Sequence, residues 1–323
     1  MYAPKSHPLV SLLRVWIVLI LGFLPAFVTG QSSKAHIVVD SRTGKILEGK
    51  NYTDKLPVAS LTKVVTACVV LDWTTARNSD MNTLMTVPAE AFVEAGANPL
   101  GLQAGDRISI RDGLGSALMA SDNISAYTLA HHIGTEMWQV DGGKARSAIE
   151  FFVSQMNLLA EARGMSRSNF VNPDGYDGGR AKGVSTAADM ARITNYAIKK
   201  PSFNFIVGQK QRDVSFMRGP EQLAFRIYNT NTLLEQFGVD GVKTGRTSRA
   251  GDCLITSVRK PDRIEILPGN RQLRTPYHLI IVVLDSTDRF RETTSLISRG
   301  WGKYESWLAA GLPMSAKDKL DMP

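Results

Sequence analysis

The chain has 323 residues, of which 43% are hydrophobic and 21% charged, and its formal net charge is +8 at pH 7. This length and apolar content allow a core large enough for one large domain or two small ones. The lysines and arginines are spread along the chain without a long basic run interleaved with aromatic residues. This distribution excludes a nucleic-acid footprint and favours anionic ligands or a negatively charged envelope.

The first thirty residues have the pattern of an export signal. Lys5 and Arg14 precede an apolar run over residues 15–28, and Val28 and Gly30 could occupy the two small-residue positions before a cleavage point. The run is short and interrupted by glycine and proline, so a cleaved signal is favoured over an uncleaved anchor. We therefore expect a signal peptide over 1–30 and export to the periplasm or another extracytoplasmic compartment.

The mature part of the chain is expected to form one domain over 31–310, followed by a short tail over 311–323. The tail does not have the pattern of an amphipathic membrane anchor, so no stable anchor is predicted beyond the signal segment. Cys68 and Cys253 both lie in apolar stretches, which predicts two buried thiols although export would permit a disulfide. Neither the cysteines nor the histidines have a metal-ligand spacing, so we expect no metal site.

The first half of the chain alternates one hairpin with a series of helices. A strand over 35–40 and a returning strand over 45–48 are joined by a turn at 41–44. Five helices are expected: the first begins at Ser60, and the second runs over 112–120 with Asp112 as its cap. The third runs over 124–133 and ends at Gly134. The fourth runs over 144–163 and ends at Gly164, and the fifth runs from 185 to an end at Pro201.

After residue 210 the pattern changes to strands, expected over 223–228, 241–244, 253–258 and 279–284. The polar, proline-containing connection over 259–278 is interpreted as a surface loop, and a helix is expected over 291–312. Strands thus come from both ends of the chain, with helices between them. The sequence predicts an α/β (α+β) sandwich, in which a mostly antiparallel sheet is flanked by helices and carries an inserted all-helical lobe over about 75–200.

The segment Pro57–Lys63 brings a serine and a lysine together at the start of a helix. Ser60 falls in the first turn, where free backbone N–H groups and the helix dipole favour negative charge. Lys63 lies one turn further along the same face. A capping serine and a solvated lysine explain this spacing equally well, because about one such pair is expected by chance in a chain of this composition.

Two further triplets follow in the chain. Ser121-Asp122-Asn123 lies between two expected helices, and Lys243-Thr244-Gly245 lies at the end of an expected strand. Alone, the first triplet is a helix cap and the second is a strand end. Together with Ser60-x-x-Lys63, and in this order, they form the motif set of penicillin-binding proteins and class A β-lactamases.

The sequence from about residue 35 to about 302 resembles the low-molecular-mass penicillin-binding proteins, which are serine D-alanyl-D-alanine carboxypeptidases of the peptidase S11 type with a β-lactamase/transpeptidase-like fold. The similarity extends beyond the three motifs to segments 39–44, 164–175, 185–190, 229–231 and 239–245. The resemblance implies that domain 31–310 is a penicillin-binding, transpeptidase-like catalytic domain. It also implies peptidoglycan stem peptides and β-lactam antibiotics as ligands, and no cofactor.

Each motif residue suits a step of acyl transfer. A serine hydroxyl needs a base, and Lys63 can act as one if it is desolvated or lies near a second cation, for which Lys243 is the candidate. Ser121 can pass a proton to the leaving amine, and Asn123 can hold a peptide amide.

The resemblance assigns the remaining substrate-binding residues. Lys243, Thr244 and Gly245 would hold the terminal carboxylate, and the backbone N–H groups of Ser60 and Arg246 would form the oxyanion hole. The arginine that receives the substrate carboxylate maps best on Arg289, with Arg291 as a close competitor. Arg246 stands where many relatives carry histidine or another uncharged residue.

The expected reaction removes the terminal D-alanine from a stem peptide through a Ser60 acyl-enzyme. A D,D-endopeptidase that acts on cross-links is a close variant. A serine β-lactamase is a second alternative, but no E-x-x-L-N match lies between the second and third motifs. A non-catalytic peptidoglycan-binding sensor is a third, and the intact Ser60 and Lys63 argue against it.

Overall fold

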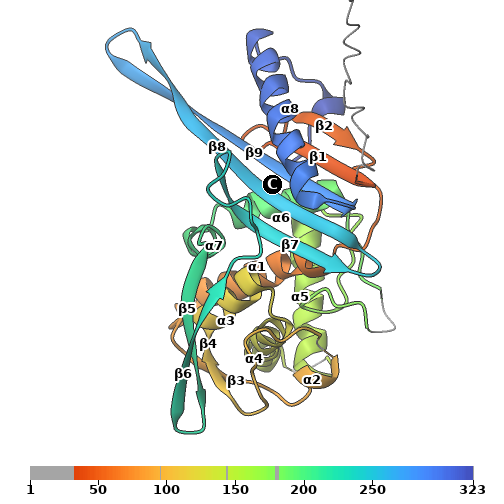
Figure 1. Cartoon of the computed structure of the whole chain (residues 1–323), viewed down its shortest axis with the longest axis vertical. Helices are drawn as coiled ribbons and strands as arrows, with labels where there is room; N and C mark the ends of the chain where they lie inside the picture. Colours follow the sequence, from red (N-terminus) through yellow and green to blue (C-terminus); the bar gives the residue numbers. More distant parts are fainter. Residues whose placement is uncertain (1–32, 95, 143–144, 179–181, 323) are drawn as a thin grey trace, which may run out of the picture. The chain divides into compact units, whose positions relative to one another are not determined.

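The computed structural model describes residues 33–94, 96–142, 145–178 and 182–322 (Figure 1). The expected signal peptide over 1–30 lies outside the described residues. A five-stranded antiparallel sheet has the order β2-β1-β9-β8-β7, so that the first hairpin of the described chain lies beside its last strands. Its strands are β1 (Ala35–Asp40), β2 (Ile46–Lys50), β7 (Val239–Thr247), β8 (Gly251–Leu267) and β9 (Arg271–Ser286).

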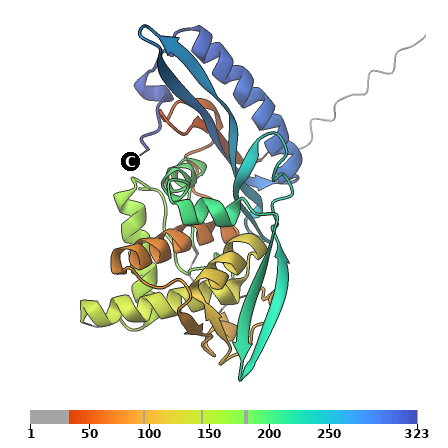
Figure 2. The same cartoon turned by 90° about the vertical axis from the view of Figure 1, so that its left-hand side faces the viewer.

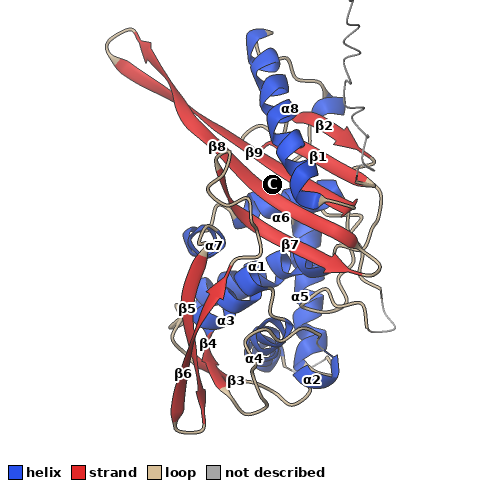
Figure 3. Ribbon diagram, in the orientation of Figure 1, coloured by secondary structure: helices blue, strands red, loops and turns tan. Residues whose placement is uncertain are grey.

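Both faces of this sheet are covered by helices. Alternate residues of β9 enter different cores: Ile280 and Val282 face one cluster, whereas Ile281 and Val283 face the other. Helix α8 (Arg289–Ala309) packs on the second face, and α6 (Ala187–Ala197) and α1 (Lys63–Arg77) belong to the first cluster. Figures 2 and 3 show this layering, with α8 and α6 on opposite sides of the sheet. A strand buried on both faces reads as a continuous apolar run, as 279–284 does.

We expected an all-helical inserted lobe, and this prediction is wrong. The lobe contains α2 (Ala91–Glu94), α3 (Ile110–Gly115), α4 (Asn123–Asp141) and α5 (Ala148–Ala162), but also two short strands, β3 (Leu84–Thr86) and β4 (Arg107–Ser109). Together with β5 (Gln211–Arg218) and β6 (Glu221–Tyr228) they form a second sheet of order β3-β4-β5-β6. Three residues are too few to display the alternation of a strand, and β4 owes its second pairing partner, β5, to a segment much later in the chain.

Two helix boundaries also differ from expectation. The cap of α3 is Ser109, whose hydroxyl accepts the Asp112 N–H at 3.0 Å, so the helix begins before Asp112. Pro201 does not end a helix but begins α7 (Pro201–Val207). At that position proline's missing N–H has no helical partner to lose. The helix expected from 185 is α6, which Thr186 caps, and Gly164, expected to end a helix, follows α5 with φ +68°.

The segment 259–278 is not a loop. It continues β8 and β9 as a two-stranded arm that runs past the ends of the neighbouring strands, with Arg263 opposite Thr275 and Leu267 opposite Arg271 (Figure 1). Most of its side chains are exposed, and its sequence is mostly polar, with only the short alternation of Ile264 and Ile266. The turn is the short connection at 268–270.

The tail returns to the folded body. Lys319 pairs with Lys45, and the Leu320 N–H donates to the Gly44 carbonyl at 2.8 Å. No helix within the described ranges is long and apolar enough to cross a membrane. Cys68 and Cys253 are buried free thiols, as predicted, and burial raises the pKa of the Cys253 thiol to about 12.

Gly134 lies inside α4, although we expected it to end a helix there. A Cβ at this position would lie 2.3 Å from the Ala148 carbonyl oxygen, so the glycine allows α5 to approach α4 closely. Replacing Gly134 with alanine should therefore destabilise the protein by about 1–3 kcal/mol through overpacking. Urea unfolding measures this loss.

The matched control for that substitution is Gly302→Ala on α8. A Cβ at Gly302 meets nothing within 4 Å. This replacement should stabilise the helix by roughly 0.5–1 kcal/mol, because alanine loses less backbone entropy than glycine. A loss of stability at Gly302, or none at Gly134, would contradict the close-approach argument.

Candidate active site

The serine of the first motif lies on a strained turn. Ser60 is in a 3₁₀ helix over Ala59–Thr62 that leads directly into α1, and Ala59 has a φ of +48°. Gly175, with φ +77°, packs against this turn so closely that a Cβ there would lie 1.9 Å from the Ala59 carbonyl oxygen. A positive φ outside glycine is costly and occurs mostly at functional sites. The turn is therefore held in place by the segment that contains Gly175.

Lys63 lies beside Ser60 and is almost completely buried. Its Nζ donates to Ser60 Oγ at 2.9 Å, to Asn123 Oδ1 at 2.6 Å and to the Asp174 carbonyl oxygen at 2.8 Å. These contacts come from the serine turn, from α4 and from the turn over 172–175. The structure thus brings the predicted nucleophile, the predicted base and Asn123 together around one nitrogen.

Burial lowers the pKa of Lys63 to about 8, against the opposing effect of the nearby Asp174 and Asp122 carboxylates. Of the two causes that the sequence left open, desolvation and a nearby Lys243, burial is the one that lowers the pKa of Lys63. The repulsion between cations acts on Lys243 instead. Burial and the charges of Lys63 and Arg289 lower the pKa of Lys243 well below its usual value. A lysine with a pKa near 8 can give up its proton at moderate pH.

The contacts of Lys63 also fix the direction of its lone pair. The Asn123 Oδ1 and the Asp174 carbonyl oxygen can only accept hydrogen bonds, so they retain two N–H donors when the amine is neutral. The third neighbour, Ser60 Oγ, then faces the nitrogen lone pair. The neutral lysine is consequently oriented to take the serine proton.

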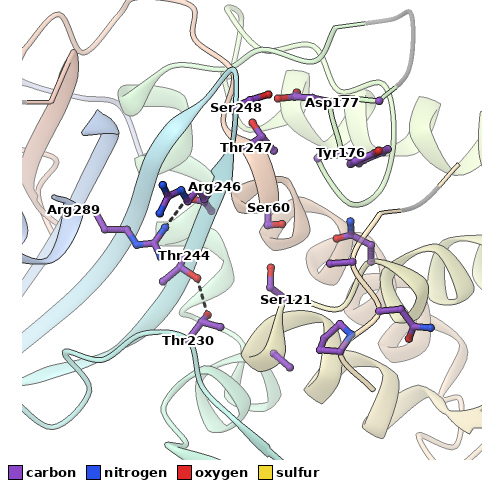
Figure 4. A pocket seen from close by; sticks show the side chains of 18 residues that line it. Ser60, Ser121, Tyr176, Asp177, Thr230, Thr244, Arg246, Thr247, Ser248 and Arg289 are labelled. Atoms are coloured by element: carbon purple, nitrogen blue, oxygen red, sulfur yellow. Dashed lines mark hydrogen bonds between the residues drawn. The ribbon is translucent and has the colours of Figure 1, made fainter. Parts of the chain in front are cut away.

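The second motif lies at the junction of two helices. Ser121, with φ +63°, ends a π-helical turn over Ser116–Ala120, and its hydroxyl and that of Ser60 point toward one another (Figure 4). Asp122 is buried and caps α4 by accepting the Ser125 N–H at 2.8 Å. Its other oxygen accepts the Leu100 N–H at 3.1 Å, which ties the 96–100 segment to this junction.

The third motif lies on β7. A Cβ at Gly245 would lie 3.2 Å from the Ser60 backbone nitrogen, so the absence of a side chain lets β7 pass beside the serine turn. Thr244 Oγ1 lies 2.6 Å from Thr230 Oγ1. Lys243 is buried, and its Nζ donates to the Thr244 carbonyl oxygen at 2.9 Å.

Of the two candidate arginines, the structure brings Arg289 to the site. Its Nη1 donates to the Gly245 carbonyl oxygen at 2.8 Å and lies 3.3 Å from Asp252 Oδ1. The Arg291 side chain is 72% exposed and pairs with Asp288. The Arg246 side chain is 76% exposed, and its Nε lies 3.5 Å from Asp252.

These residues surround a cavity of about 850 Å³ (Figure 4). Seven of the nine predicted site residues line it: Ser60, Ser121, Asn123, Thr244, Gly245, Arg246 and Arg289. Lys63 and Lys243 are buried behind them. The sequence analysis missed Asp174, Tyr176 and Thr230 as site residues. Asp174 and Thr230 both lie in segments that the sequence distinguishes only by their resemblance to the family.

Among the described residues, no group of three or more histidine, cysteine, aspartate or glutamate side chains is placed to hold a metal ion. The polar side chains that line the cavity are hydroxyls, the amides of Asn98 and Asn123, the carboxylate of Asp177 and two arginines. Such groups bind a peptide and its carboxylate directly.

The fold and the cavity define the class of this protein. A sheet built from both chain ends, a helical lobe and three motifs around one cavity form the β-lactamase-like fold of the DD-peptidases. A family model described as D-alanyl-D-alanine carboxypeptidase, peptidase S11, matches residues 28–267. The chain belongs to this peptidase S11 family, as the sequence resemblance predicted.

Two curated relatives illustrate the range of the family. A D-alanyl-D-alanine endopeptidase of Pseudomonas aeruginosa is 32% identical over 241 residues, which cover 73% of this chain and 71% of that protein. The D-alanyl-D-alanine carboxypeptidase DacF of Bacillus subtilis is 29% identical over 278 residues, which cover 85% of this chain but only 63% of that protein.

Solved structures show the same fold. The crystal structure of the Streptomyces K15 DD-transpeptidase superposes with a TM-score of 0.68 at 24% identity, and the match covers 85% of this chain and all of that one. A D-alanyl-D-alanine carboxypeptidase, DacD, of Francisella tularensis superposes with a TM-score of 0.67 at 23% identity over 83% of this chain and 69% of that one.

Proposed function

We propose that this protein is a serine D,D-peptidase that removes the terminal D-alanine from peptidoglycan stem peptides through a Ser60 acyl-enzyme. The observation that carries the proposal is the contact of Ser60 Oγ with a buried lysine whose other two neighbours are acceptors. Such a lysine is suited to the removal of a hydroxyl proton. Family membership supplies the substrate class.

The proposed reaction proceeds in two steps. Ser60 Oγ attacks the carbonyl of the penultimate D-alanine while its proton passes to the neutral Lys63. The backbone N–H groups of Ser60 and Arg246 stabilise the developing oxyanion. The proton then reaches the leaving amine through Ser121, D-alanine departs, and water hydrolyses the acyl-enzyme.

The same cavity holds the substrate in register. Asn123 Oδ1 is occupied by Lys63, so its amide NH₂ is the group left to donate to a peptide carbonyl. At the β7 side of the cavity, Thr244 and Arg289 bind the terminal carboxylate, and the side chain of Lys243 is buried behind them.

Incubation with a pentapeptide stem, followed by mass spectrometry of released D-alanine, tests this proposal. We expect loss of one D-alanine from wild type and none from a Ser60→Ala variant. Release at the same rate by both proteins would contradict the assignment of Ser60. A wild type that leaves the pentapeptide intact but binds it would favour a peptidoglycan-binding sensor.

D,D-endopeptidase activity is the second candidate. Its support is the 32% identity to the Pseudomonas aeruginosa endopeptidase over 73% of the chain. A cross-linked stem dimer added in the same assay would be cut to monomers by an endopeptidase and left intact by a strict carboxypeptidase.

We also propose that β-lactam antibiotics acylate Ser60 and that the protein acts outside the cytoplasm after cleavage of segment 1–30. Family membership supports extracytoplasmic action on the cell wall. A long-lived penicillin adduct is expected of a penicillin-binding protein, whereas rapid penicillin turnover would identify a β-lactamase. The catalytic domain would extend over 31–310.

Arg289 should contribute strongly to substrate binding, whereas Arg291 should not. Replacing Arg289 with alanine should lower kcat/KM for a stem pentapeptide about 10- to 100-fold, because one charged hydrogen bond to the carboxylate is lost. The change should lie mostly in KM. The matched control, Arg291→Ala, should leave both constants within about 2-fold, because that side chain is exposed and outside the cavity. Equal losses in the two variants would refute this assignment.

A further inference from the structure

Thr230 occupies a position between the strand that carries the third motif and the turn that carries the second. Its N–H donates to the Met119 carbonyl oxygen at 3.0 Å, and its hydroxyl donates to the same oxygen at 3.2 Å. The same hydroxyl lies 2.6 Å from Thr244 Oγ1, and both threonines line the cavity (Figure 4). Thr230 therefore connects the Thr244 hydroxyl to the segment that ends at Ser121.

The two hydroxyls share only two protons, so their hydrogen bonds have two arrangements. In the first, Thr230 donates to the Met119 carbonyl and Thr244 donates to Thr230. Thr244 then presents only lone pairs to the cavity, which repel a carboxylate. In the second, Thr230 donates to Thr244, and the proton of Thr244 is directed into the cavity.

The second arrangement leaves no buried carbonyl without a donor. The Met119 oxygen gives up the Thr230 hydroxyl but retains the Thr230 N–H at 3.0 Å. The bond that is given up, at 3.2 Å, is longer than the hydroxyl–hydroxyl contact that persists in both arrangements. Since a buried carbonyl is costly only when it has no partner at all, the change between arrangements is small in free energy.

We propose that Thr230 is a positioning residue that makes Thr244 a hydrogen-bond donor for the carboxylate of the ligand. When the carboxylate arrives, Thr230 turns its proton from Met119 to Thr244, and Thr244 donates to the ligand. A hydroxyl that accepts one hydrogen bond becomes a stronger donor in the next, so the effect is largest for an anionic acceptor. This inference rests on the proposed function, because it assigns Thr244 to the ligand carboxylate.

The test compares penicillin with its methyl ester, which lacks the anionic carboxylate. Second-order acylation rates are measured by intact-protein mass spectrometry for wild type, Thr230→Val and Thr230→Ser. Valine matches threonine in shape but has no hydroxyl, and serine retains the hydroxyl. Thr230→Val should lower the rate for penicillin about 10- to 30-fold and that for the ester less than about 3-fold. Thr230→Ser should stay within about 3-fold of wild type for both.

The ratio of the two rates separates this role from general damage to the site. Equal losses of acylation rate for acid and ester would assign Thr230 a merely structural role. No loss of rate for either compound would show that Thr230 does not influence acylation. If valine disturbs folding, as a lowered Tm would reveal, Thr230→Ala removes the same hydroxyl and should give the same change in ratio. A wild type that is acylated by neither compound would overturn the proposed function itself, rather than only the positioning role of Thr230.

Discussion

Wild-type protein incubated with a labelled penicillin should gain one covalent adduct, and a Ser60→Ala variant should gain none. This substitution removes one heavy atom, the hydroxyl oxygen Oγ, which is the atom that Lys63 Nζ contacts at 2.9 Å. Without a nucleophile no acyl-enzyme can form, so the loss should be complete. Intact-protein mass spectrometry detects the adduct directly.

The control for this experiment is a serine away from the cavity. Ser202 is exposed on α7, and Ser202→Ala should be labelled as fast as wild type. Ser60 is half-buried, so its replacement should change the free energy of unfolding by less than about 1 kcal/mol. Labelling of a folded Ser60→Ala variant at the wild-type rate would sink the acyl-enzyme assignment.

The rate of penicillin acylation should rise with pH in the wild type, reach half its maximum near pH 8 and level off above that pH. Burial lowers the pKa of Lys63 to about 8, and only the neutral amine can take the serine proton. Below that pKa the neutral fraction falls about 10-fold per pH unit, so the rate should fall in the same proportion. Stopped-flow or quenched acylation between pH 6 and 9 measures this profile.

Lys63→Arg separates the charge of this side chain from its basicity. Arginine keeps a cation near Ser60 but cannot lose its proton in this range. We expect acylation to fall about 10²- to 10⁴-fold and the rise toward pH 8 to disappear. A variant that retains the wild-type profile would show that another group is the base, and Lys243 would be the next to replace.

The sequence predicted most strands of the five-stranded sheet and the three motifs well, because the pattern of each strand and each motif is local. The strand over 279–284 is a continuous apolar run, and the serine turn precedes an equally apolar helix. The same reasoning failed where an element owes its form to a distant partner. Strand β4 pairs with β5, the first strand of a hairpin from later in the chain, and Gly134 is required by a neighbouring helix rather than by a helix end.

Within the site, the amino-acid types by themselves determined which residues could carry acyl transfer: a serine with a lysine one turn away, a second serine, an amide and a strand-end threonine. Tertiary structure decided how they act. Burial, which no local pattern reports, lowers the pKa of Lys63, and a turn more than a hundred residues away supplies the Asp174 carbonyl that helps orient it.

Tertiary structure also decided which residues at the edge of the cavity belong to the site. Arg289 and Arg291 are two residues apart, and the sequence favoured Arg289 with Arg291 as a close competitor; in the structure only Arg289 contacts Gly245 and lines the cavity. Thr230 belongs to the site because it contacts Met119 and Thr244, neither of which is its neighbour in the chain. A sequence states which groups are available, whereas the direction of a side chain and the water around it depend on everything packed against it.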